Sequence, residues 1–164
     1  MLDPAVWLAL FPITFAIHFA EEFWGGEGYV AYLYRLRGVR VTNRRFFWFQ
    51  FAGFVGFCLA GVISLAFDFP HFMILVLSGF VFCNGVSHTL TAISHREYGP
   101  GLIASFALWI PLGFISIYSL YGHMPFNRWL LATAIGLAIN GVVAIVTMRG
   151  GKLRGQSRAG SDPN

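Results

Sequence analysis

The sequence predicts an all-α membrane protein, a bundle of five transmembrane helices. Of its 164 residues, 57% are hydrophobic and only 11% are charged, and the mean hydropathy is +0.66. A soluble domain of this length is much less apolar. Five apolar stretches each reach or approach the roughly 20 residues that a helix needs to cross a hydrocarbon core of about 30 Å. They run over about residues 5–23, 46–67, 70–93, 101–121 and 128–148.

The positive charges predict how the bundle is oriented. If the connection 24–45 is cytoplasmic, ten of the eleven Lys and Arg residues lie on that side and only Arg128 lies outside. Because Lys and Arg gather on the cytoplasmic side of membrane proteins, we expect the N-terminus outside and the C-terminus inside. The expected location is the inner (plasma) membrane. The net charge of +4 comes from this asymmetry, so it does not indicate nucleic-acid binding.

The remaining segments predict structure but no chemistry. Residues 1–149 form the five-helix domain, and the connection 24–45 mixes tyrosines with arginines, which predicts a short amphipathic helix at the membrane surface. The basic tail 150–164 is rich in Gly and Ser and is expected to be disordered. The span 46–67 reads as packing and lipid contact without chemistry, and its small residues would also allow a homo-oligomer. Trp109 and Pro111 predict a kink in the fourth span.

The most informative stretch is His18-Phe-Ala-Glu21-Glu22, at the end of the first apolar segment. On a helix these three ionisable side chains project over one quadrant of the surface. Ionisable groups inside a bilayer are costly, so they usually face the bundle interior and serve a function. The two carboxylates differ by about 100° around the helix, so both cannot share the best inward direction. If one of them faces the arginine-rich connection, we expect it to be Glu21, which leaves Glu22 with His18.

The third span carries a second polar stripe. Its members are spaced four, three and four residues apart and therefore fall along one face of the helix: Asn84, His88, Thr91 and His95. His88 and His18 each lie about five residues before the inner end of their spans, roughly 7 to 9 Å below the cytoplasmic edge. Asn140, in the fifth span, is about 12 Å deep by the same count, near the level of Asn84. A lone Asn in a membrane helix more often bonds to a neighbouring helix than lines a site.

These motifs resemble those of a known family. His18-Phe-Ala-Glu21-Glu22 is similar to the motif that names the HXXEE family, small bacterial multi-pass membrane proteins without an established reaction. The Asn and His four apart in the third span, followed by Pro100-Gly101, also resemble the later pattern of this family. The resemblance covers roughly the first two thirds of the chain. It implies that five residues form one site: His18, Glu21, Glu22, Asn84 and His88.

The side chains of this site favour a metal-dependent membrane enzyme with a lipophilic substrate. In this interpretation His18, Glu22 and His88 ligate a divalent metal ion, either zinc, iron or manganese. Glu21 ligates as well or acts as a base, and Asn84 orients His88 or the substrate. A cytoplasmic opening with aromatic walls suits a lipophilic small molecule. The expected partners are therefore this substrate and membrane lipids.

Three alternatives stay open from the sequence. A carboxylic acid beside an imidazole could move protons without a metal, as an isomerase or cyclase of isoprenoid or sterol-like lipids would. Intramembrane His and Glu also mark metal or proton carriers, although the chain has no inverted repeat. In the purely structural alternative, the glutamates pair with arginines of the connection 24–45 and His18 bonds to a neighbouring helix.

Overall fold

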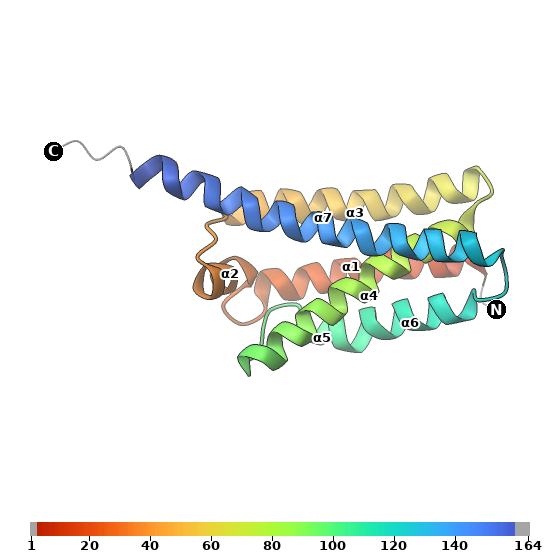
Figure 1. Cartoon of the computed structure of the whole chain (residues 1–164), viewed down its shortest axis with the longest axis horizontal. Helices are drawn as coiled ribbons and strands as arrows, with labels where there is room; N and C mark the ends of the chain where they lie inside the picture. Colours follow the sequence, from red (N-terminus) through yellow and green to blue (C-terminus); the bar gives the residue numbers. More distant parts are fainter. Residues whose placement is uncertain (1–2, 160–164) are drawn as a thin grey trace.

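The computed structural model describes residues 3–159, and the side chains of residues 3–147. Within this range the chain forms helices and no strands, arranged as an elongated bundle (Figure 1). Five helices are long and apolar enough to cross a membrane, in agreement with the predicted number. They are α1 (Pro4–Trp24), α3 (Asn43–Ala66), α4 (Pro70–His95), the continuous helix Leu102–Ser119, and the segment Phe126–Thr147 of α7 (Phe126–Ala159).

The outward faces of these helices are apolar. Large side chains such as Ile13, Val62 and Phe106 are each more than half exposed. A soluble protein rarely leaves so many large apolar side chains in water. The polar residues of the bundle lie mostly inside it, which is the arrangement expected of helices surrounded by lipid.

Helix α4 is the centre of the bundle, because it packs against α1, α3, α6 (Ile110–Ser119) and α7. It meets α7 through glycines: a Cβ atom on Gly79 would lie only 3.3 Å from the Cα atom of Gly136. Small residues permit such close approach between membrane helices. Ser78 of α4 and Ser116 of α6 share a hydrogen bond of 2.6 Å. These contacts fix α4 against α6 and α7, while His88 in its C-terminal half meets Glu22 of α1.

The fourth membrane-length helix contains a wide turn. It begins as α5 (Leu102–Ala104), continues as a π-helical turn η1 (Ser105–Trp109) and ends as α6 (Ile110–Ser119). The sequence predicted a kink here from Pro111, which stands in the first turn of α6. Proline has no N–H group and disturbs the α-helical ladder one turn before it, and the backbone N–H of Ile110 bonds instead to Ser105. Such π-helical turns are frequent at functional sites.

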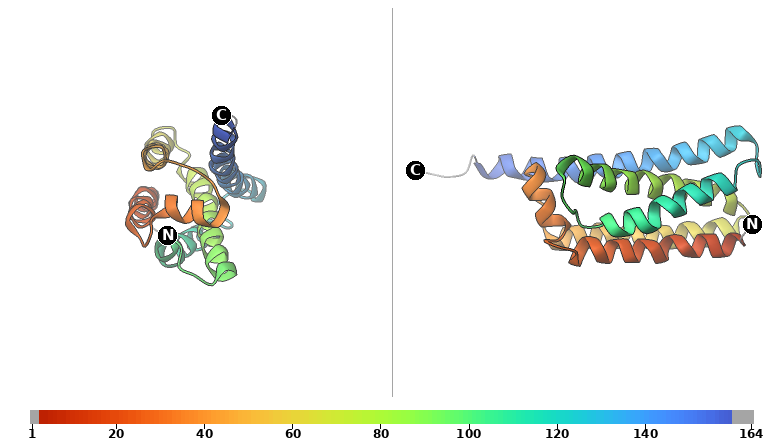
Figure 2. Two further views of the ribbon diagram at one scale, coloured as in Figure 1. Left: turned by 90° about the vertical axis from the view of Figure 1, so that its left-hand side faces the viewer. Right: turned by 90° about the horizontal axis from the view of Figure 1, so that it is seen from below.

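The helix α2 (Tyr29–Arg37) lies across the end of the bundle at which α1 ends (Figure 2, left). Arg35 holds it there through Glu27, at 2.6 Å, and through Glu97 after the end of α4, at 3.1 Å. At the other end of the chain, α7 continues as helix to Ala159, where the sequence predicted a disordered tail from 150. Once started, a helix extends at little cost per residue. The rest of that predicted tail, 160–164, lies outside the described residues.

Candidate metal centre and its cavity

Two residues of α1 and one of α4 meet inside the bundle. The Nε2 atom of His18 lies 3.5 Å from Oε1 of Glu22, and the Nε2 atom of His88 lies 3.4 Å from the same oxygen. The three potential ligand atoms all lie within 4.8 Å of one another. Helix α1 packs directly on α4. The structure thus brings together the three residues that the sequence predicted as metal ligands.

This cluster is shielded from the surroundings. His18 is 1% exposed and Glu22 is 3% exposed, while the His88 side chain is 12% exposed. A buried carboxylate needs hydrogen bonds or opposite charges to offset its loss of hydration. Both imidazoles supply such partners to Oε1, and Gln50 supplies another to the second oxygen.

Gln50 belongs to α3, the span that the sequence analysis interpreted as packing without chemistry. That interpretation is wrong for this residue, because its side-chain N–H donates a hydrogen bond to Oε2 of Glu22. The two oxygens of Glu22 are therefore held separately, one toward the imidazoles and one toward α3. The signal that could have found Gln50 is simple: it is the one amide side chain in the stretch 46–67.

The π-helical turn η1 fixes the ring of His18. Trp109 stacks on this ring with a centroid separation of 3.8 Å and an interplanar angle of 27°. Ser105 places its Oγ atom 3.5 Å from Nδ1 of His18, on the side of the ring away from Glu22. Groups of this kind orient metal-ligating histidines and set their tautomer. From the sequence Trp109 was predicted only to lie at a kink, and its contact with His18 was missed.

Gly101 packs against all three members of the cluster. A Cβ atom at this position would lie 2.8 Å from Cε1 of His18, 2.9 Å from Cγ of Glu22 and 3.0 Å from Cε1 of His88. Its φ of +88° is also one that residues with a side chain rarely adopt. Both the space and the backbone conformation therefore require glycine here. This gives a physical reason for the Pro-Gly pair in the sequence motif.

Glu21 points away from the cluster toward the start of α5. Its carboxylate accepts hydrogen bonds from the Tyr98 hydroxyl at 2.8 Å and from the backbone N–H groups of Ile103 and Ala104 at 2.8 and 2.6 Å. Glu21 therefore caps the fourth membrane-length helix, where the first N–H groups lack partners. Glu21 is thus the carboxylate that turns away from His18, toward the start of α5 and not toward the arginine-rich connection. Burial raises the pKa of the Tyr98 hydroxyl to about 12, and the hydrogen bond to Glu21 adds to this effect.

Helix α2 covers the cluster from the outside. The ring of Tyr29 lies 5.7 Å from that of His88 and stacks on Phe46 at 5.5 Å. Burial raises the pKa of the Tyr29 hydroxyl well above its ordinary value, and the nearby Glu22 carboxylate adds to this effect. Tyr29 therefore keeps its proton beside the cluster. From the sequence this tyrosine was predicted only to lie at the membrane surface.

A cavity of about 740 Å³ extends from the cluster between α3, α4 and α7. Asn84, Thr91 and Asn140 all line it. Within the described residues the structure gives no hydrogen bond from Asn84 to His88. No direct contact therefore supports the predicted role of Asn84 in orienting His88. His95 is exposed at the end of α4. The polar stripe predicted on the third span thus divides into cavity-lining residues and an exposed end.

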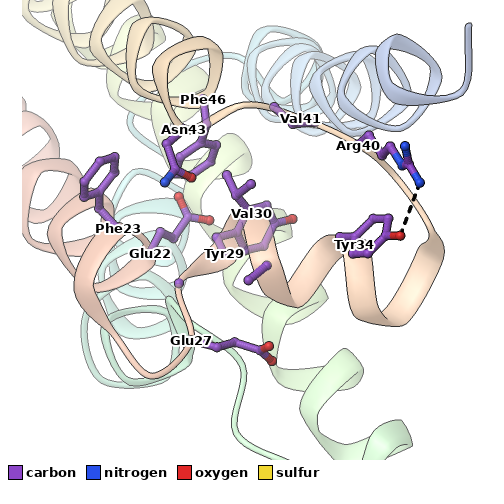
Figure 3. Close-up of a pocket in the computed structure, with 12 residues that line it drawn as sticks. Glu22, Phe23, Glu27, Tyr29, Val30, Tyr34, Arg40, Val41, Asn43 and Phe46 are labelled. Atoms are coloured by element: carbon purple, nitrogen blue, oxygen red, sulfur yellow. Dashed lines mark hydrogen bonds between the residues drawn. The ribbon is translucent and has the colours of Figure 1, made fainter. Parts of the chain in front are cut away.

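A second pocket, of about 550 Å³, reaches Glu22 from the side of α2. Figure 3 shows Glu22 from α1, Tyr29 from α2, and Asn43 and Phe46 from α3 around its inner end. Arg40 lies at the opposite end, where it donates to the Tyr34 hydroxyl (Figure 3). Glu22 is therefore a shared wall of a polar pocket and of the larger cavity.

The fold and the site define an all-helical protein with five helices able to cross a membrane and a buried His/Glu cluster that could hold a metal ion. The chain belongs to the HXXEE family: residues 9–116 match the family described as "Protein of unknown function with HXXEE motif". This match confirms the resemblance seen in the sequence, and it includes every residue of the cluster. No curated protein and no solved structure matches the chain.

Proposed function

We propose that this protein is a membrane enzyme that acts on a lipophilic substrate with a divalent metal ion held by His18, Glu22 and His88. The observation that carries the proposal is the convergence of these three donors, from two helices, beside a largely apolar cavity. Two imidazoles and one carboxylate suit zinc, iron or manganese. Three protein ligands also leave a coordination position for water or substrate.

The distances fit a metal ion. Donors at about 2.0 to 2.2 Å from a tetrahedral ion are about 3.4 Å apart. Glu22 Oε1 lies at 3.5 and 3.4 Å from the two Nε2 atoms, so two edges of such a tetrahedron are already present. The remaining edge requires a small approach of the two imidazoles. Ser105 and Gln50 supply the outer hydrogen bonds that such sites need.

The residues around the cluster have distinct parts in this proposal. A bound metal ion would polarise a substrate oxygen or lower the pKa of a bound water. Tyr29, protonated beside the cluster, can donate a hydrogen bond to the substrate. Asn84 lies in the cavity wall one helical turn before His88 and can contact the substrate there. Glu21 lies outside the ligand set and caps the start of α5.

The proposal places the protein in the inner (plasma) membrane, with its N-terminus outside and its C-terminus in the cytoplasm. The distribution of Lys and Arg supports this orientation. The pocket beside α2 would then open to the cytoplasm and give water and metal ions a path to Glu22. Reporter fusions at each connection would test this orientation.

Metal analysis of detergent-purified protein tests the proposal. We expect about one zinc, iron or manganese ion per chain, lost in His18→Ala, in His88→Ala and in Glu22→Gln. His71→Ala is the matched control, because His71 lies outside the cluster. Helical circular dichroism and gel filtration identify variants that fail to fold. Folded wild-type protein without metal, or cluster variants that keep it, would contradict the proposal.

A metal-free acid–base enzyme is the second candidate, because Glu22 Oε1 already lies within ion-pair distance of both imidazoles. Such a cluster could pass a proton to or from a bound lipid. Metal-free protein that binds a lipid in a manner dependent on Glu22 would favour this function.

A further inference from the structure

We propose that the cavity beside the cluster binds one single-chain lipid, with its polar end at His18, Glu22 and His88 and its hydrocarbon chain between α3 and α7. The identity of the reacting end rests on the proposed function, whereas binding of the chain rests on the cavity alone. Three features of the cavity carry the inference: the order of its wall residues, its shape, and its open side.

The walls change from polar to apolar in the same direction on three helices. On α4 the lining residues run from Phe72 and Met73 through Asn84 to His88. Helix α7 runs in the same direction (Figure 1) and lines the cavity first with Ile135, then with Asn140 and last with Thr147. In the antiparallel α3 the one polar lining residue, Gln50, lies in the first part of the helix after Phe46 and Phe49, and only apolar or small residues follow it. A ligand that satisfies all three walls has one polar end and one long apolar end.

The shape of the cavity suits a single chain. Its wall on α4 extends from Phe72 to Thr91, which spans about 28 Å along the helix. A cavity of about 740 Å³ drawn out over this length is long and narrow, which suits one extended hydrocarbon chain.

The cavity borders the surface of the bundle between α3 and α7. Both helices pack on α4, and each contributes partly exposed residues to the wall: Phe49 is 40% exposed and Ile139 is 44% exposed. These side chains belong to membrane-length helices, so this rim faces lipid in the proposed arrangement. A chain can therefore enter sideways from the bilayer and keep its apolar surface out of water throughout.

Gly56 of α3 gives a way to block the chain without touching the cluster. It lines the cavity, and a Cβ atom there would meet nothing within 4 Å. It lies six residues beyond Gln50, about 9 Å farther along the helix. A phenylalanine at this position would occupy the space of the chain. Gly141 of α7 also has open space around it and lies outside the cavity wall, so Gly141→Phe is the matched control.

The experiment measures binding of oleate to detergent-purified protein, by native mass spectrometry and by equilibrium titration. Wild type and Gly141→Phe should bind one molecule, and Gly56→Phe should bind at least tenfold more weakly. Ala60 also lines the cavity. Ala60→Phe, whose ring would occupy the same space, is therefore the second blocking variant. Gel filtration and circular dichroism confirm that each variant is folded. Equal binding by wild type and both folded blocking variants would overturn the proposal, as would absence of oleate binding by wild type.

A second measurement tests the direction of the chain. An oleate analogue with a photoreactive group at its methyl end should label the peptide that contains Phe72 and Met73, at the apolar end of the cavity. Labelling confined to α2 would overturn the assigned direction. Metal content is measured in the same samples and should be unchanged in Gly56→Phe. Failure of the predicted lipid binding and failure of the predicted metal binding can therefore be distinguished in the same samples.

Discussion

Gly101→Ala is the substitution that probes the cluster most selectively from outside it. The new Cβ atom would lie between 2.8 and 3.0 Å from atoms of all three proposed ligands. Carbon atoms do not approach so closely without displacement. The ring of His18 cannot move aside freely, because it stacks on Trp109 at 3.8 Å. We therefore expect the ligands to separate and the metal affinity to fall by about 10- to 100-fold, the range seen when the support of metal ligands is lost.

The backbone contributes a second effect that must be separated from the first. At φ +88°, an alanine costs about 1 to 2 kcal/mol relative to the ordinary helical region. Gly122→Ala is the matched control, because Gly122 has φ +82° and a Cβ atom there would meet nothing within 4 Å. Both variants should lose the backbone contribution to the free energy of unfolding in mixed micelles, and Gly101→Ala should lose more because of the displaced side chains. Only Gly101→Ala should lose metal affinity, measured by chelator competition, and wild-type affinity in that variant would refute the reasoning.

Three further predictions concern residues around the cluster. Glu21→Ala removes the acceptor of three hydrogen bonds and should lower the free energy of unfolding by about 2 kcal/mol with unchanged metal content; metal loss in the folded variant would contradict its capping role. Gln50→Ala should weaken metal binding about 10- to 100-fold, and an unchanged Kd would contradict its contact with Glu22. Tyr98, with its pKa raised from 10.0 to about 12, stabilises the fold below pH 10 and loses this contribution as pH rises to about 12; Tyr98→Phe should remove that part of the alkaline destabilisation, and an identical pH profile would contradict it.

The membrane helices and the proximity of His18 to His88 could both be predicted from the sequence, because a membrane limits the structures that a chain can form. A membrane restricts spanning segments to apolar helices, so residues can be counted from a common edge. Two imidazoles at the same depth on helices of the same direction can meet if the helices are neighbours. The structure satisfies that condition, because α1 packs on α4.

Other residues of the site were missed because depth does not fix how a helix is rotated. Gln50 lies at a suitable depth, but its contact with Glu22 depends on the facing of α3, which is apolar nearly all round. The role of Trp109 depends on the π-helical turn, which rotates the following residues relative to a regular α-helix. A count at 3.6 residues per turn cannot anticipate that rotation.

The two neighbouring glutamates illustrate a further limit. The angle of about 100° between them correctly separates their directions, and Glu22 does remain with His18. The partners of Glu21, however, lie at the start of α5, some eighty residues later in the chain. A pattern within one helix carries no information about such a distant backbone N–H group. The partners of Glu21 therefore could not be predicted from the sequence.

X-ray absorption spectroscopy of the zinc-loaded protein tests the central claim most directly. The shared centre predicts a first shell of two imidazole nitrogens and carboxylate oxygen at about 2.0 to 2.2 Å, and this shell should be absent in His18→Ala and in His88→Ala, which lose the metal ion. A shell of oxygen atoms alone, or a spectrum that neither substitution changes, would contradict it.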